Sequence, residues 1–278
     1  MSYDIYSGLL KAFAMSTATK TNTNFSYDNN NPHFNQLKSN YPIETVAGNG
    51  DDFSKAVNLM NWVSEHIFYK GDYEGTLGNS LDLLNYAYNK GESGGINCVA
   101  LATILSDCML AVGLKARRAF LMPCSPYDGD FHAVTHVYIR EMNKWVMLDP
   151  TFNLYFSNEQ GEYLSLLELR DYLANQNPVI KNNNAKSINI EYFAKNLFYF
   201  QMFENSTFGE GNAIGEGQVS KNRIVILSPP GYDAKKTRLD NIEYRMKIYN
   251  SHDNPVMQKW VERLKQEEYF YCSVIDFE

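Results

Sequence analysis

Apolar residues recur at helical spacing in several segments of the chain. The first series runs over residues 53–67, as Phe53, Val57, Met60, Val63 and Ile67. This spacing predicts an amphipathic helix, and the acidic pair at 51–52 is typical of an N-cap. Similar patterns predict helices over residues 80–89 and 97–112, and Gly113 is a suitable end for the second of them.

Short runs rich in β-branched and aromatic residues follow these helices and predict strands. They cover residues 115–122, 131–140, 144–148, 154–157 and 163–164. The short connection at 141–143 indicates a hairpin between the second and third runs. Helices first, with an antiparallel sheet after them, indicate an α+β chain.

The pattern divides the chain into three parts. Residues 1–50 form an N-terminal arm that we expect to be irregular from residue 16 onward, because that segment has no sustained apolar period. Residues 51–175 hold the predicted core, closed by a helix that Ser165 caps. Residues 176–278 are a C-terminal extension that packs on the core. In it we expect helices over 192–203 and 254–268, strands over 223–227 and 269–275, and a mobile glycine-rich loop over 205–221.

Composition and charge exclude several classes of protein. Hydrophobic residues make up 44% of the 278 residues and charged residues 21%, so the chain can bury a sizeable core. The net charge of −7 argues against nucleic acid or an anionic membrane as a partner. No apolar run approaches the ~20 residues of a membrane span. The N-terminus does not resemble a signal peptide, so we expect a cytoplasmic protein, with a removed leader peptide left open.

The four cysteines are unevenly spaced, at Cys98, Cys108, Cys124 and Cys272. They contain no C-x-x-C pair, so a structural zinc site is not indicated, and four in a chain of this length do not form a disulfide scaffold. Reduced thiols are the simplest interpretation.

Cys98 is the best placed of these thiols to act as a nucleophile. It stands where the Gly94-Gly95 turn enters a predicted helix, and the unpaired N–H groups of a helix start stabilise a thiolate or an oxyanion. The alternative is a buried core cysteine, which is the commoner fate of a single thiol and fits Cys108 in mid-helix. Position alone supports the two interpretations of Cys98 about equally.

A thiol nucleophile needs a base and a group that orients it. His132 and His136 are four residues apart on one predicted strand, so they share a face and either can serve as the base. Asp149 ends the next strand, where a turn residue before Pro150 is the ordinary interpretation. Counting back through the hairpin places His136 closer to Asp149. His132 would lie beyond the residues that pair with the end of the Asp149 strand.

The order of these residues and their neighbours resembles the transglutaminase-like superfamily. The matching segments are Gly95-Ile96-Asn97-Cys98, Gly113-Leu114-Lys115-Ala116-Arg117, His136-Val137-Tyr138, and Trp145 with Leu148-Asp149-Pro150-Thr151. They correspond to that family's Gly-x-Cys helix start, its Gly-Ile-x-Ala-Arg exit, its His-x-Trp-Val strand and its Trp-x-x-Leu-Asp-Pro-Thr strand. The resemblance covers roughly residues 51–174.

The resemblance implies a papain-like core, in which a nucleophile helix packs on an antiparallel sheet that carries the His and the Asp. It implies acyl transfer through a thioester, with Cys98 as nucleophile, His136 as base and Asp149 as the orienting group.

Two features depart from the family pattern. Two residues rather than one separate Gly95 from Cys98, and Tyr138 stands where the family has Trp. The second oxyanion donor stays open, with Asn97 as one candidate.

Other interpretations of these residues rank lower. Arylamine N-acetyltransferases share the Cys-His-Asp order, but Ser93 and Ala100 stand here where that family has an Arg and an acid. An inactive binding module has no need of the complete set. A metal site built from Cys124, His132 and His136 lacks ligand spacing and a fourth partner. We see no acidic cation loop and expect no cofactor.

Hydrolysis of an amide or peptide bond is the activity that we expect. Cross-linking needs a shielded channel in which an amine outcompetes water, and the sequence does not identify one. The expected partner is a protein, peptide or small amide substrate. Transglutaminase cross-linking and arylamine N-acetyltransferase-like transfer remain alternatives.

Overall fold

The central element of the fold is a six-stranded sheet with the strand order β10-β9-β7-β2-β3-β4. The computed structural model describes residues 2–15, 23–75, 77–209, 223–248 and 254–278. Only β9 and β10 pair in parallel within this sheet, and the other neighbours are antiparallel. The strands are β2 (Lys115–Met122), β3 (His132–Ile139), β4 (Lys144–Leu148), β7 (Tyr199–Phe203), β9 (Ile224–Leu227) and β10 (Tyr269–Tyr271). The predicted α+β class is confirmed.

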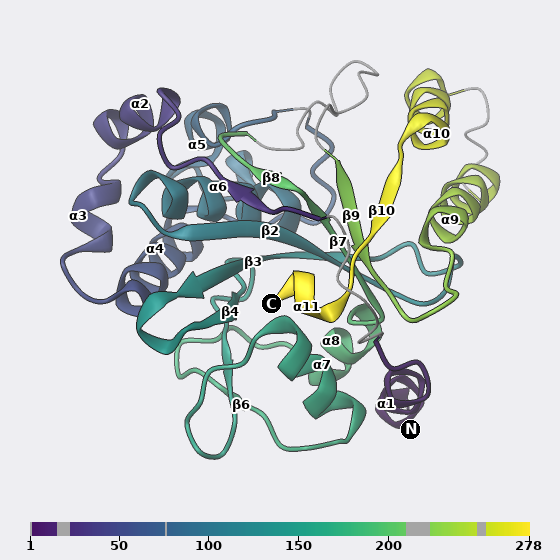
Figure 1. Ribbon diagram of the computed structural model, residues 1–278. Helices are drawn as coiled ribbons and strands as arrows, with labels where there is room; N and C mark the ends of the chain where they lie inside the picture. Colours follow the sequence, from purple (N-terminus) through teal and green to yellow (C-terminus); the bar gives the residue numbers. More distant parts are fainter. Residues whose placement is uncertain (1, 16–22, 76, 210–222, 249–253) are drawn as a thin grey trace.

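Helices that precede the sheet in the chain cover one of its faces (Figure 1). They are α2 (His33–Asn40), α3 (Ile43–Ala47), α4 (Asp52–His66), α5 (Ser80–Ala87) and α6 (Cys98–Ala111), with the 3-10 turn η1 (Gly91–Gly94) before α6. Helix α6 is buried along nearly its whole length, because it lies between the sheet and its neighbours α4 and α5. The expected helix with Cys98 at its start therefore packs on an antiparallel sheet.

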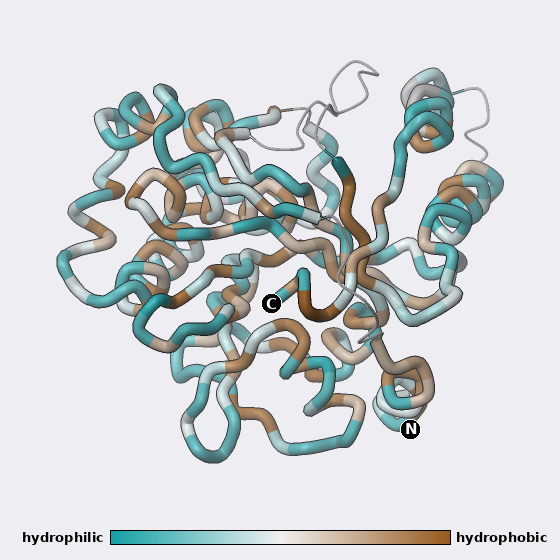
Figure 2. The backbone as a smooth tube through the Cα atoms, in the orientation of Figure 1, coloured by the Kyte–Doolittle hydropathy of each residue, from teal (hydrophilic) through white to brown (hydrophobic). Residues whose placement is uncertain are grey.

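A second group of helices lies on the opposite face of the sheet (Figure 1). They are α1 (Ser2–Ala12), α7 (Leu166–Ala174), α8 (Ile190–Asn196) and the short α11 (Val274–Phe277). Buried aromatic side chains fill the space between them and the strands, among them Phe156, Phe193, Phe198, Phe200 and Phe277. Figure 2 shows the hydrophobic segments running through the central strands and α11, with hydrophilic turns around them.

Helices α9 (Ala234–Ile248) and α10 (Pro255–Gln266) pack together beside the edge formed by β9 and β10 (Figure 1). The remaining strands lie outside the central sheet, as the pairs β1 (Ser26–Tyr27) with β8 (Asn205–Ser206) and β5 (Phe156–Ser157) with β6 (Ile180–Lys181). No helix in the described ranges is long and apolar enough to cross a membrane.

Caps begin the helices where the sequence predicts them. Asp51 accepts a hydrogen bond from the backbone of Ser54 at the start of α4, and Ser165 forms a capping box with Glu168 at the start of α7. Gly113 follows α6 with a φ of +85°, a conformation that favours glycine. The predicted hairpin is also confirmed, with the turn η2 (Arg140–Met142) between β3 and β4.

The prediction of an irregular N-terminal arm is wrong for its second half. Helices α2 and α3 occupy that segment because Phe34, Leu37, Ile43 and Ala47 are buried in the same cluster as α4 and α6. The polar residues between these positions hide their periodicity in a short window.

The predicted helix over residues 192–203 is also wrong in part. The helix ends at Asn196, and Tyr199–Phe203 form β7 between β2 and β9. The final predicted strand is shorter than expected, because Ser273 caps α11 after it. Asn205–Ser206, expected in a loop, form β8, which pairs with β1. Residues 210–221 of the expected loop lie outside the described residues.

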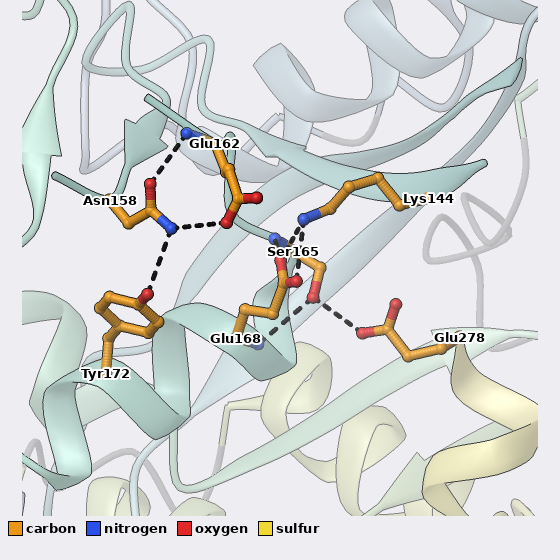
Figure 3. A network of polar contacts seen from close by, with 7 residues as sticks. All are labelled: Lys144, Asn158, Glu162, Ser165, Glu168, Tyr172 and Glu278. Carbon is orange, nitrogen blue, oxygen red and sulfur yellow. Dashed lines mark hydrogen bonds and ion pairs between the residues drawn. The ribbon is translucent and has the colours of Figure 1, made fainter. Parts of the chain in front are cut away.

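The C-terminal end of the chain is tied to β4 and α7 (Figure 3). Ser165 Oγ donates to Glu278 Oε1 at 2.8 Å, and Trp145 Nε1 donates to the Glu278 carbonyl at 2.8 Å. Lys144 Nζ contacts both carboxylate oxygens of Glu168, at 2.8 and 2.7 Å. These bonds hold α11 against the sheet, and the C-terminal region also supplies three of the six strands of the sheet, β7, β9 and β10.

Candidate active site

Cys98 is the first residue of α6, with 9% of its surface exposed. Asn97 is the N-cap: its Oδ1 accepts from the Ala100 N–H at 3.0 Å, and its Nδ2 donates to the Tyr73 carbonyl at 3.0 Å. Both ends of the amide therefore have a partner, which fixes the side chain in its capping position. The first-turn N–H groups of Cys98 and Val99 have no acceptor within the helix and point toward its N-terminal end.

The extra residue between Gly95 and Cys98 has a structural role. Ile96 forms a parallel β-bridge with Tyr69, in which Ile96 N–H donates to the Phe68 carbonyl at 3.0 Å. The approach of the two segments is close, because a Cβ on Gly95 would lie 2.7 Å from that of Lys70. The bridge fixes the start of α6 and brings Tyr69 beside Cys98.

His132 and Asp149 form a buried pair at the same end of the sheet as the start of α6. His132 Nε2 lies 2.7 Å from Asp149 Oδ2, with side-chain exposures of 1% and 0%. The other oxygen of Asp149 accepts from the backbone N–H of Thr151 at 2.8 Å and of Phe152 at 3.4 Å. The carboxylate is held in one orientation, and it holds the imidazole in turn.

Cys98 is close enough to His132 to affect the pKa of the imidazole. Burial by itself lowers the pKa of this imidazole, but the charge and hydrogen bond of Asp149 act against burial and raise it well above its ordinary value. The hydrogen bond and charge of Cys98 act in the same direction. The structure thus brings Cys98, His132 and Asp149 together in that order.

The predicted position of His136 beside Asp149 is wrong. His136 Nδ1 lies 3.2 Å from Arg117, and its ring stacks on Trp145 with 4.9 Å between centroids. Phe277 of α11 covers the ring at 5.5 Å. Burial, followed by the charge of Arg117, lowers the pKa of His136 well below its ordinary value, so this histidine is neutral.

The register of the hairpin explains why counting failed. Thr135 lies opposite Leu148, so Asp149 comes level with Val134, and the two histidines are each two residues from that level. Counting along the strands therefore does not distinguish them. The pairing of β2 with β3 does distinguish them, because it places Arg117 on β2 opposite His136 on β3, and a neighbouring cation disfavours a histidine that must become charged.

Aromatic residues surround the His132 ring. Phe152, Tyr192 and Phe193 lie with ring centroids 5.5, 5.4 and 6.0 Å from it. Such packing restricts rotation of the imidazole and excludes water from the His132–Asp149 bond.

Two phenol groups lie within electrostatic reach of Cys98. Burial raises the pKa of Tyr69 to about 12, and the charge on Cys98 adds to this effect. Burial also raises the pKa of Tyr192, as do the charges of Asp130 and Cys98. Both hydroxyls therefore stay neutral and can donate hydrogen bonds.

The remaining thiols differ from Cys98 in their surroundings. Cys108 is fully buried in α6, and burial raises its pKa well above the ordinary value. Burial raises the pKa of Cys272 to about 12 and also raises that of the half-buried Cys124. Across the described ranges, no three His, Cys, Asp or Glu side chains gather as a metal site would require.

Part of the chain is similar to a known family. Residues 39–150 match the family model of the transglutaminase-like superfamily, a range that contains Cys98, His132 and Asp149. The crystal structure of a "putative cysteine protease" from Cytophaga hutchinsonii is 17% identical, with a TM-score of 0.34. The similarity covers 54% of this chain and 49% of that one, so the match spans about half the length of the relative. No curated protein matches the chain. The predicted resemblance to the superfamily is confirmed over the matched residues.

Proposed function

We propose that this chain of the transglutaminase-like superfamily is a cysteine-dependent enzyme that hydrolyses an amide or peptide bond through a thioester. In this proposal Cys98 is the nucleophile, His132 the general base and acid, and Asp149 the group that orients the imidazole. His132 thus takes the role that the sequence assigned to His136. The substrate is a protein, a peptide or a small amide, and we expect the enzyme to act in the cytoplasm.

One observation carries the proposal. A buried imidazole hydrogen-bonds a fixed carboxylate, and the same imidazole interacts with the Cys98 thiol at a helix N-terminus. Burying an ionisable pair is costly, so a core that needed only packing has no use for it. The same order of groups activates a thiol by removing its proton and holding the resulting imidazolium.

The residues perform the first half of the reaction as follows. His132 holds the proton of the Cys98 thiol as an imidazolium, and the sulfur attacks the carbonyl carbon of the amide. The N–H groups of Cys98 and Val99 donate to the oxygen that becomes negative. When the carbon–nitrogen bond breaks, His132 gives the proton to the leaving amine and a thioester remains on Cys98.

Water completes the second half. It attacks the thioester, His132 accepts a proton from it, and the carbon–sulfur bond breaks to release the acid and the thiol. Tyr69, which lies within electrostatic reach of Cys98, is 38% exposed, so the site borders solvent on this side. This exposure supports hydrolysis over transfer to an amine, which requires the exclusion of water.

p-Nitrophenyl acetate is a suitable probe because its acyl group can be followed by mass. We expect intact-mass spectrometry to detect one acetyl group that maps to Cys98 and is removed by hydroxylamine. Cys98→Ala should lose the adduct, and His132→Ala should slow its formation by several orders of magnitude. An adduct on another residue, or an unchanged rate in His132→Ala, would contradict the proposal.

A second experiment tests which molecule accepts the acyl group from Cys98. Adding glycine ethyl ester to the same reaction offers an amine in competition with water. We expect acetate to remain the main product, and predominant formation of the acetylated amine would show that the enzyme is a transferase. An arylamine as the competing acceptor tests N-acetyltransferase-like transfer in the same way. Absence of any adduct, together with p-nitrophenol release no faster than in Cys98→Ala, would support the inactive binding module instead.

A further inference from the structure

A small pocket lies between the β2–β3 connection and helix α9. It is lined by Phe131, Tyr199, Thr237, Arg238 and Asn241, and by the acids Asp128 and Asp130. The pocket is at the end of β3 that carries His132, because Phe131 is the residue directly before it. Asn241 of α9 closes one side by donating to the carbonyls of Pro126 and Asp128, each at 2.8 Å.

Arg238 brings a positive charge to this pocket that no acid neutralises. Its guanidinium lies over the ring of Phe131, 5.0 Å from the centroid, and no described carboxylate is within ion-pair distance of it. The two acids of the pocket have another partner, since Lys195 contacts Asp128 at 3.0 Å and Asp130 at 3.1 Å. The guanidinium is therefore available for an anion that comes from outside.

One buried phenol adds a hydrogen-bond donor to the pocket. Tyr199 is 1% exposed and lines the pocket beside Arg238. Burial raises the pKa of this hydroxyl, and the charge of Arg238 opposes the increase. The hydroxyl therefore stays neutral and can donate to an anionic ligand that Arg238 holds.

The pocket adjoins the candidate active site. Lys195, which contacts Asp128 and Asp130 of the pocket, lies over the ring of Tyr192, 5.7 Å from its centroid. Tyr192 also packs against the His132 ring at 5.4 Å. A substrate whose acyl carbon lies at Cys98 can therefore place a neighbouring group in the pocket.

We propose that this pocket binds a carboxylate of the substrate, through Arg238 with the hydroxyl of Tyr199. The inference rests on the proposed function, because it assigns a specificity subsite to the same reaction. A guanidinium matches a carboxylate with two parallel hydrogen bonds. A phosphate dianion fits less well, since Arg238 compensates one negative charge and Lys195 is already paired with Asp128 and Asp130.

Alkylating reagents of matched shape test the subsite without a known substrate. Iodoacetyl derivatives of glycine, β-alanine and γ-aminobutyrate place a carboxylate at increasing distance from the reactive carbon, and their carboxamides are neutral equivalents. The rate of Cys98 alkylation is followed by intact mass and peptide mapping. From the net charge of −7 alone, the acids should react more slowly than the amides.

We expect at least one acid to react with Cys98 roughly tenfold faster than its amide, as one charge-assisted contact allows. Arg238→Gln should remove this preference and leave the amide rates within about twofold of the wild-type rates. Tyr199→Phe should weaken the preference. Lys236→Gln is the control: it removes one positive charge from an exposed position on α9 and should leave the preference for the acid unchanged.

The outcomes separate the two proposals. If the amides label Cys98 but no acid is preferred, or the preference survives Arg238→Gln, the subsite is wrong and the nucleophile stands. If none of the reagents labels Cys98 in the native protein, the proposed function fails and the subsite fails with it.

Discussion

His132 donates through Nε2 to Asp149 Oδ2 at 2.7 Å, and both side chains are buried from solvent. The bond joins the first residue of β3 to the residue that follows β4, at the end of the sheet where α6 begins. Because the carboxylate is itself fixed by two backbone N–H groups, the pair forms a rigid unit that faces Cys98. The predictions below follow from this unit and from the groups around it.

Cys98 should be the fastest-reacting thiol of the protein. Iodoacetamide at mildly acidic pH, followed by peptide mapping, should label it first, because a partner base and a helix N-terminus favour its thiolate. Cys108 and Cys272 should react only after unfolding, since burial raises their pKa. Labelling of Cys124 or Cys272 ahead of Cys98 would contradict this assignment.

The two histidines should respond differently to substitution. His132→Ala should slow Cys98 alkylation at mildly acidic pH and abolish acyl transfer, because the thiol loses its base. His136→Ala should leave both rates nearly unchanged while lowering the melting temperature, since it removes a ring packed between Trp145 and Phe277. We expect a loss of about 2 kcal/mol in unfolding free energy. The opposite pattern would restore His136 as the base.

Asp149→Asn should change how stability depends on pH. The folded-state pKa of His132 is raised above 6.5, so its contribution to stability is complete below that pH and is lost as the pH rises through the folded-state value. The amide removes the charge that raises this pKa, so the fall in stability above about pH 6.5 should become shallower. Urea unfolding at a series of pH values checks this, and ¹⁵N-histidine NMR should show His132 titrating at lower pH in the variant. Identical profiles for the two proteins would mean that Asp149 does not hold the imidazolium.

Asn97 should matter as a helix cap rather than as an oxyanion donor. Asn97→Ala removes the bonds to Ala100 and Tyr73 and should cost about 1 kcal/mol of unfolding free energy or somewhat more. Asn97→Ser retains a capping oxygen and should recover most of the stability and of the acetylation rate. If the amide donated to the oxyanion, the serine variant would be as slow as the alanine variant despite its recovered stability.

Ser165 should contribute to stability without affecting the chemistry. Its hydroxyl caps α7 and holds Glu278, so Ser165→Ala should cost about 1–2 kcal/mol in denaturant unfolding (Figure 3). Alkylation of Cys98 should proceed at the wild-type rate. A slower rate in native protein would indicate that the C-terminal anchor also shapes the active site.

Much of the local structure follows from the sequence because its causes are local. The apolar series over residues 53–67, the cap at Ser165 and the glycine at Gly113 each specify a helix boundary through neighbouring residues. Segment 199–203 is a case in which neighbouring residues do not specify the secondary structure. Its aromatic residues suit a helix or a strand, and only the partners β2 and β9, which are distant in the chain, make it a strand.

The sequence by itself determined that Cys98 begins a helix, that the two histidines share one strand face, and that Asp149 ends the next strand. These are consequences of spacing and backbone periodicity. The choice between the histidines was made by the tertiary structure, because it depends on which groups surround each ring. Residues far away in the chain, Arg117 and Phe277, enclose His136 and keep it neutral, while Asp149 turns back to bind His132. Burial and nearby charge set the pKa of an imidazole, and no count along a strand contains either.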